Sequence, residues 1–189
     1  VEKMASSRRL RQKDGSITAR MSRTRDAAMR ALPEGRIDPW LKTVTLFNGS
    51  QPVVQLHYYA THPQSFYGDR RLTYDVPGIV RERLQKETGV FQIYFSGCGG
   101  DVAFGKYNDG TRTARDRLVD RLDRGMRQSV SEVKRFRVDG FGWKSLPVRF
   151  GSRREPTFSS KHCRRVLADA GASDSQRLRA AITLAWNQR

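Results

Sequence analysis

Two loops carry the residues best suited to chemistry, and each loop follows a strongly apolar run. Residues 53–59 lead into 61–63 (Thr-His-Pro), and residues 90–95 lead into 97–101 (Gly-Cys-Gly-Gly-Asp). If both apolar runs are strands of a parallel sheet, ligands bind outside their carboxyl ends. The sequence therefore predicts that an imidazole, a glycine-rich turn and a carboxylate lie at one edge of a sheet.

His62 is the first candidate for a functional side chain. A neutral imidazole at a strand end, next to a turn-forming proline, is placed like a metal ligand or a general base. The alternative is a surface histidine with no role in chemistry. His57 alternates inside the preceding strand and is expected to be structural, whereas His162 lies in a charged helix. A zinc site takes three or four protein ligands, so any metal here would need residues outside these 189.

The glycines of the second loop, Gly97, Gly99 and Gly100, form the second candidate. They allow backbone amides to approach a ligand closely, which suits an oxyanion or substrate loop or a phosphate nest. Residues 100–106 also match the start of a Walker A motif, G-x-x-x-x-G-K. The motif then requires Ser or Thr to hold magnesium, and this chain has Tyr107. The sequence therefore favours an oxyanion or substrate loop over nucleotide binding.

Two carboxylates, Asp75 and Asp101, are the third candidate, as catalytic groups. Asp75 precedes Pro77 by two residues, so it can instead cap a helix. Asp101 could orient His62 or a catalytic water, or it could cap the turn by accepting backbone amides. A right-handed βαβ crossover would bring His62 and Asp101 within about 10 Å. The chain has no Gly-x-Ser-x-Gly elbow, so the serine mechanism of α/β-hydrolases is not supported.

The elements that must position these residues can be located from local patterns. Two alternating apolar runs, 42–47 and 52–59, flank Asn48-Gly49, the strongest short-range signal for a β-hairpin. A helix over 77–86 should follow. The continuous apolar run 90–95 is typical of a buried central strand, which completes a βαβ unit.

This pattern predicts one α/β domain with a mixed sheet, truncated at both ends, with the βαβ unit at its centre. Residues 1–36 are basic and poor in periodicity, and we expect an extended arm or loop there, with a short helix within 23–32. Residues 37–189 would form the partial α/β domain. Further elements are expected as follows: helices over 112–130, near 160–167 and over 177–186, and strands over 133–138 and 143–150.

The net charge of +17 points to a nucleic acid or an anionic membrane surface as a partner. The basic residues are spread among acidic ones, so weak, non-specific binding to polyanions is expected, and a basic nucleic-acid-binding module is the alternative function. No run approaches the roughly 20 apolar residues of a membrane span, and no secretory signal is visible. Cys98 and Cys163 can pair only if their Cα atoms lie within about 7 Å.

Several of these segments together resemble the neutral/alkaline, non-lysosomal ceramidase family, in particular its planctomycete-type bacterial branch. Nearly the whole chain is similar. The segments that carry the resemblance are 37–41, Tyr59-Ala60-Thr61-His62-Pro63, Asp75-Val76-Pro77-Gly78, Gly97-Cys98-Gly99-Gly100-Asp101-Val102, 105–110 and the helix over 178–186.

The resemblance implies a zinc amidohydrolase that acts on an N-acyl amide, such as a ceramide-type lipid, or on a related ester. Its metal is held by two histidines, a glutamate and a tyrosine, of which only His62 maps onto this chain. The others would lie before Val1 and after Arg189, so the chain is expected to be the inactive middle piece of an exported enzyme's catalytic domain.

One position departs from the family pattern. Ala103 stands where the family has a serine regarded as central to amide cleavage. A methyl group cannot attack a carbonyl, so hydrolysis would need a metal-activated water. A scaffold that has lost catalysis is the alternative.

Overall fold

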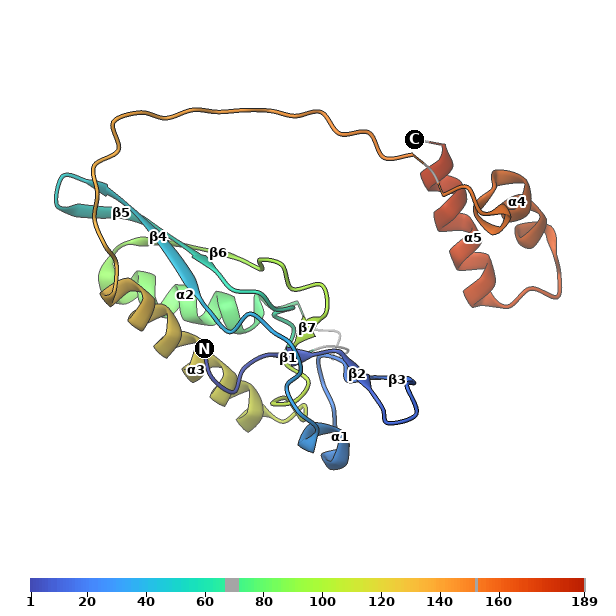
Figure 1. Cartoon of the computed structure of the whole chain (residues 1–189), viewed down its shortest axis with the longest axis horizontal. Coiled ribbons are helices and arrows are strands. Elements are labelled where there is room, and N and C mark those ends of the chain that lie inside the picture. Colours follow the sequence, from blue (N-terminus) through green and yellow to red (C-terminus); the bar gives the residue numbers. More distant parts are fainter. Residues whose placement is uncertain (67–71, 152, 189) are drawn as a thin grey trace. The chain divides into compact units, whose positions relative to one another are not determined.

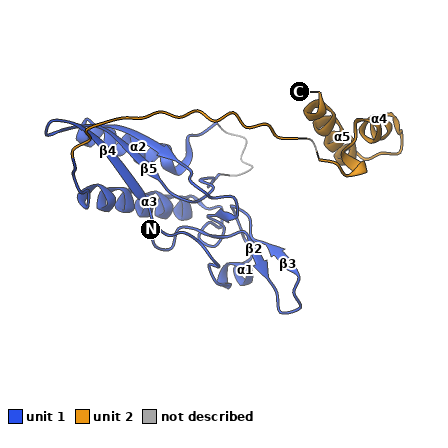
Figure 2. Cartoon of the chain, turned by 45° about the horizontal axis from the view of Figure 1, so that its top comes forward, with its two compact units in different colours: residues 1–136 blue, residues 137–189 orange. Residues whose placement is uncertain are grey.

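A computed structural model describes residues 1–66, 72–151 and 153–188 of the chain. It confirms the α/β class with a mixed sheet. The chain divides into two compact units, Val1–Phe136 and Arg137–Arg189 (Figure 2), whereas the sequence predicted one domain over 37–189. None of the helices in the described part is long and apolar enough to cross a membrane.

The first unit is built on a three-stranded sheet with the order β4-β5-β6 (Figure 1). β4 (Lys42–Asn48) pairs antiparallel with β5 (Gln51–Tyr58), and Gly49 turns the chain between them with φ +59°. The predicted hairpin is therefore confirmed. β5 pairs parallel with β6 (Phe91–Phe95), which makes the sheet mixed.

The βαβ unit is also confirmed. α2 (Asp75–Thr88) connects β5 to β6 and ends at Gly89, whose left-handed backbone lets its N–H bond to the Gln85 carbonyl at 2.9 Å. The position of β6 differs from the prediction of a buried central strand. In the described sheet β5 is the middle strand, and β6 lies at an edge with Phe91 about half exposed. An apolar run alone does not tell an edge strand from a central one.

Two helices, α2 and α3 (Arg112–Ser131), pack together, α2 against β6 and α3 against β4 (Figure 1). Their apolar stripes meet in the core, where Val80, Leu118 and Leu122 are fully buried. Burial of such side chains contributes about 1.5–3 kcal/mol each. This core holds in place the sheet whose strands β5 and β6 lead into the two candidate loops.

The face of the sheet beneath these helices carries a buried polar network. Gln92 donates from Nε2 to the Val90 carbonyl at 3.0 Å, which leaves its Oε1 to accept from Nε2 of His57 at 2.8 Å. Nδ1 of His57 then accepts from the Thr43 hydroxyl at 2.8 Å. His57 is fully buried, and its contacts support the structural role predicted for it.

The N-terminal segment is part of this unit, which differs from the predicted extended arm. β1 (Ser6–Ser7) pairs antiparallel with β7 (Val102–Ala103), directly beside the glycine loop. Met4 and Ala5 are buried in the core. β2 (Arg9–Arg11), β3 (Ile17–Ala19) and the short helix α1 (Ala27–Ala31) follow. The segment is so basic that its few apolar residues, which pack in the core, gave no recognisable pattern in the sequence.

Two cations hold the segment after α1 in place. The Arg20 guanidinium is fully buried and donates to five backbone carbonyls, those of Ser7, Met29, Leu32, Pro33 and Glu34, at 2.8–3.4 Å. The Lys106 ammonium donates to the Arg30 carbonyl at 2.8 Å and to that of Leu32. Positive charge at a helix C-terminus satisfies carbonyls that have no partner within the helix. Burial lowers the pKa of both groups.

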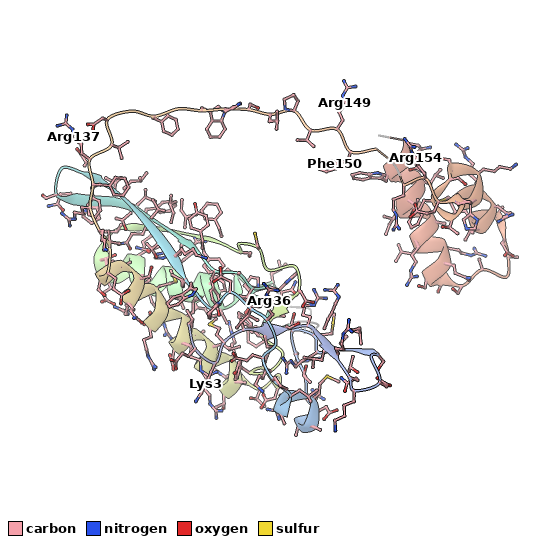
Figure 3. All side chains as sticks on the ribbon, viewed as in Figure 1. Lys3, Arg36, Arg137, Arg149, Phe150 and Arg154 are labelled. Atoms are coloured by element: carbon pink, nitrogen blue, oxygen red, sulfur yellow. The ribbon has the colours of Figure 1, made fainter. Side chains whose placement is uncertain are left out.

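Residues 133–155 contain no helix or strand in the part that the structure describes, so the predicted strands over 133–138 and 143–150 are wrong. Phe141 and Trp143 are 88% and 84% exposed, and Arg149 and Phe150 lie on the same extended stretch (Figure 3). Alternation favours extended backbone, but a strand also needs a neighbour for its hydrogen bonds.

The second unit is a helical hairpin. η1 (Pro156–Phe158) and α4 (Ser160–Ala168) pack against α5 (Asp174–Asn187), as the sequence predicted in outline. Ser159 caps α4 by accepting the His162 N–H, and Cys163 is buried and free. Cys98, in the first unit, is exposed and free.

Candidate functional site

The two candidate loops meet at the carboxyl ends of β5 and β6. The His62 backbone N–H donates to the Val102 carbonyl at 2.8 Å, and His62 forms a parallel bridge with Ala103. The ring Nδ1 lies 2.8 Å from the Gly99 carbonyl and 3.1 Å from the Val102 carbonyl. The structure thus brings the imidazole and the glycine loop together, as the sequence predicted.

These contacts determine which nitrogen of the His62 ring carries the proton. A carbonyl oxygen can only accept a hydrogen bond, so Nδ1 must be the protonated nitrogen. In the neutral ring Nε2 is then unprotonated, and it makes no hydrogen bond within the described residues. The half-buried ring therefore presents a lone pair on Nε2, as a metal ligand or a general base requires.

The other two histidines have the opposite arrangement. Nε2 of His57 donates to Gln92, and Nδ1 of His162 accepts from the Arg165 guanidinium at 3.1 Å. In both neutral rings the proton therefore lies on Nε2. Within the described part of the chain, His62 is the one histidine that has an Nε2 lone pair without a hydrogen-bond partner.

The glycine loop approaches Thr61 so closely that position 99 has no room for a side chain. A Cβ on Gly99 would lie 2.8 Å from the Thr61 carbonyl carbon. Gly97 has φ +49°, a left-handed conformation that favours glycine. The N–H groups of Gly99 and Val102 bond to carbonyls within the loop. The amides of Cys98 and Gly100 make no hydrogen bond within the described residues, so they could donate to a ligand.

Asp101 does not orient His62 in this structure. Its carboxylate accepts from the Ser7 hydroxyl at 2.6 Å and pairs with the Arg9 guanidinium at 2.5 Å. Its backbone carbonyl accepts the Arg8 N–H at 2.6 Å. Asp101 therefore fastens the glycine loop to the N-terminal segment, and backbone carbonyls orient the imidazole. Among the described residues, the carboxylate makes neither the predicted contact to His62 nor a cap on the turn amides.

Asp75 contacts two segments, the start of α2 and the loop that follows His62. It is the first residue of α2, while Tyr74 takes the capping position. One carboxylate oxygen accepts the Val76 N–H at 2.8 Å, and the other accepts the Ser65 N–H at 2.9 Å. The Ser65 hydroxyl also donates to this carboxylate. Asp75 therefore binds the loop that follows His62.

Two residues of this site, Ser65 and Asn108, were not singled out from the sequence. Asn108 is fully buried, and its Nδ2 donates to the carbonyls of Ser65 at 2.9 Å and Ser22 at 2.8 Å. A serine and an asparagine in polar loops carry no distinctive local pattern. Asn108 lies in segment 105–110, which carries part of the family resemblance, but the sequence assigned it no role.

Ala103 is fully buried beneath β1, where Ser6 is its cross-strand partner. The Ser6 hydroxyl donates to the Ala103 carbonyl at 3.3 Å. The methyl group at position 103 therefore lies inside the protein.

The zinc ion that the family resemblance implies can be tested against these residues. His62 fits, because a zinc-bound histidine usually donates its other ring N–H to a backbone carbonyl or carboxylate. Within the described residues, no group of three or more His, Cys, Asp or Glu side chains is placed to hold a metal. His62 alone would hold zinc weakly, so further ligands would have to come from elsewhere.

A hollow of about 380 Å³ lies next to the His62 loop and the start of α2. Its lining residues are Pro63, Gln64, Phe66, Thr73, Tyr74 and Asp75. A larger hollow of about 730 Å³, between the N-terminal segment and α3, does not include the His62 loop. The smaller hollow is thus better placed to receive a substrate.

No protein-family model matches the chain, and no curated protein or solved structure matches it either. The resemblance to the ceramidase-like family therefore stays a prediction.

Proposed function

We propose that the chain forms part of the catalytic domain of a zinc-dependent hydrolase of the neutral ceramidase-like family. Its substrate would be an N-acyl amide, such as a ceramide-type lipid, or a related ester. The observation that supports this proposal is the His62 ring, whose Nδ1 donates to the Gly99 and Val102 carbonyls while Nε2 is free. Segments of the polypeptide outside these 189 residues would supply the remaining ligands.

In this proposal the residues of the chain bind and orient. His62 is a ligand through Nε2, and the carbonyls of Gly99 and Val102 keep the proton on Nδ1. The amides of Cys98 and Gly100 are available to donate to the carbonyl oxygen of a substrate, as an oxyanion hole does. When bound, zinc would lower the pKa of a water molecule and polarise that carbonyl.

Ala103 bears on the reaction type. It offers no hydroxyl for attack on the substrate, and its side chain is buried. In a hydrolytic reaction, water would therefore be the nucleophile. The alternative is a catalytically inactive scaffold, which would bind the metal but would not hydrolyse amides. Hydrolysis of N-acyl substrates by the polypeptide with its flanking segments separates these two outcomes.

A zinc titration followed by NMR of the ring nitrogens tests the metal ligand. Zinc should shift Nε2 of His62 before it affects His57 or His162, because only the His62 ring presents a free lone pair. The His62→Ala variant should lose this response, and His162→Ala should keep it. If zinc shifts His162 but leaves His62 unchanged, the ligand assignment is wrong.

A second candidate function is binding to a nucleic acid. It is favoured by the exposed stretch 135–150, which contains the aromatic residues Phe136, Phe141 and Trp143 together with several basic residues. Bases stack on exposed aromatic rings, while arginines contact phosphates. Binding to unrelated DNA and RNA sequences should be weak and should fall steeply as salt rises. Tight binding that survives physiological salt would favour this function over hydrolysis.

A further inference from the structure

The loop that carries His62 is fixed at a second point, three residues further along the chain, at Ser65. Ser65 is only 2% exposed, and each of its polar groups is bonded. Its N–H and hydroxyl donate to the Asp75 carboxylate, and its carbonyl accepts from Nδ2 of Asn108 at 2.9 Å. Ser65 is therefore held from two directions, by the start of α2 and by the loop before α3.

Asp75, which binds Ser65, has an unfavourable backbone conformation. Its φ is +52°, which residues other than glycine rarely adopt and which costs on the order of 1 kcal/mol or more. Two contacts maintain it: the Thr73 hydroxyl accepts the Asp75 N–H at 2.9 Å, and the Tyr74 ring packs on Gly78, where a Cβ would lie 1.6 Å from the ring. Such conformations concentrate at functional sites.

Asn108 uses all of its side-chain polar atoms in hydrogen bonds, including the one to Ser65. Besides the two carbonyls that its Nδ2 binds, its Oδ1 accepts the Gly110 N–H at 3.0 Å. Both polar atoms of a fully buried side chain are therefore used to join the His62 loop to two other segments. An aliphatic side chain at this position would leave buried carbonyls without donors.

We propose that Ser65, Asp75 and Asn108, here called the Ser65 clamp, are positioning residues for the His62 imidazole. Backbone bonds hold the loop at His62, and the clamp holds it at Ser65, with Pro63 restricting the chain between them. With both ends fixed, the ring stays on the Gly99 carbonyl and Nε2 keeps its direction. The inference rests on the proposed function only in taking His62 as the working residue, and it assigns Asp75 to positioning instead of catalysis.

The hydrogen bond from Nδ1 of His62 is the quantity to measure, in the 189-residue chain without metal. NMR of the ring nitrogens should show His62 protonated on Nδ1, with its N–H protected from exchange with water. In Asp75→Asn and Ser65→Ala this N–H should exchange about tenfold faster, because each variant weakens the contact between Ser65 and residue 75 and so loosens the loop that holds the ring on the carbonyl. Asparagine tolerates positive φ, so Asp75→Asn changes the contacts more than the backbone.

Asp14→Asn is the matched control. Asp14 accepts the N–H and hydroxyl of Ser16, as Asp75 does for Ser65, but in the turn between β2 and β3. This variant should leave the His62 N–H unchanged. The ring signals of His57, buried in the core, report that each variant is folded.

Unchanged exchange of the His62 N–H in folded Asp75→Asn and Ser65→Ala would overturn the proposal. Ser65→Ala keeps both backbone bonds of Ser65, so it tests the clamp even if Asp75→Asn does not fold. The zinc titration separates this proposal from the proposed function. If zinc leaves His62 unaffected while both variants free its ring, the metal assignment fails and the clamp stands.

Discussion

Gly99 and Thr61 lie so close together that the glycine at position 99 decides how His62 is held. The Gly99 carbonyl accepts both the Val102 N–H and Nδ1 of His62. A Cβ at this position would press on backbone atoms of Thr61, which cannot rotate away as a side chain can. The orientation of the His62 imidazole therefore depends on the absence of a Cβ at position 99.

Gly99→Ala should destabilise the protein by about 1–3 kcal/mol, because the loop must move away from Thr61 to admit the methyl group. The same shift should weaken the hydrogen bond from His62. Gly100→Ala is the control, since a Cβ there meets nothing within 4 Å, and its effect should stay within about 0.5 kcal/mol. Urea unfolding measures both. Equal effects of the two substitutions would contradict the argument.

His57 makes the stability of the protein depend on pH. Burial lowers the pKa of its ring below the ordinary value, although the hydrogen bond to Gln92 opposes this in part. As pH falls below about 6.5, the ring is protonated in the unfolded chain before it is protonated in the folded protein. The stability that the neutral ring contributes is thus present above about pH 6.5 and is lost on acidification.

The free energy of unfolding should therefore decrease between neutral pH and about pH 5, and decrease less in His57→Asn, which cannot titrate there. Urea unfolding at the two pH values gives the comparison. His162→Asn, in α4 of the second unit, serves as the control and should keep the wild-type slope. A slope unaffected by His57→Asn would assign the pH dependence to other groups.

β1 and the residues before it form a structural element of the first unit. Met4 is fully buried, in the cluster that also contains Leu122 of α3. Through its pairing with β7, β1 also covers the residues that follow the glycine loop. The N-terminal segment thus helps to hold the glycine loop of the candidate site in place.

Met4→Ala should lower the free energy of unfolding by about 2–5 kcal/mol, because it leaves a cavity in a packed core. Met21→Ala provides the comparison, since Met21 is 43% exposed and its loss should cost far less. Urea denaturation of both variants measures the difference. A small effect of Met4→Ala would mean that the segment adds little to the core.

The whole chain consists of two units joined through a long stretch without helix or strand in its described part, residues 133–155. Each unit has its own packed elements. The basic residues of this stretch, including Arg137, Lys144 and Arg149, are exposed. Arg20, in contrast, is buried among carbonyls of the first unit.

Brief trypsin treatment should therefore cut first after Arg137, Lys144 or Arg149, because proteases prefer exposed chain without regular structure. Mass spectrometry should then find a persistent N-terminal fragment that ends at one of these residues. Arg20 should resist cleavage under the same conditions. Early cleavage at Arg20 would contradict the packing described for the N-terminal segment.

Local patterns in the sequence were sufficient for much of the fold. Asn48-Gly49 between alternating runs predicted the hairpin, and Gly89 marked the end of α2. The amphipathic spacing of Leu118 and Leu122 predicted α3. These features depend on residues near one another in sequence, where backbone conformation and side-chain periodicity act directly. The same patterns placed His62 and the glycine loop at neighbouring strand ends.

The tertiary structure alone decided which groups contact one another across the candidate site. Nδ1 of His62 bonds to a carbonyl 37 positions away, and Asp101 pairs with Arg9, 92 positions away. The alternating run over 143–150 did not become a strand, because a strand needs a partner that its own sequence does not specify. The local sequence pattern determines which helix, strand or turn a segment can form. A hydrogen bond also requires a partner group, and the packing of distant segments decides which group that is.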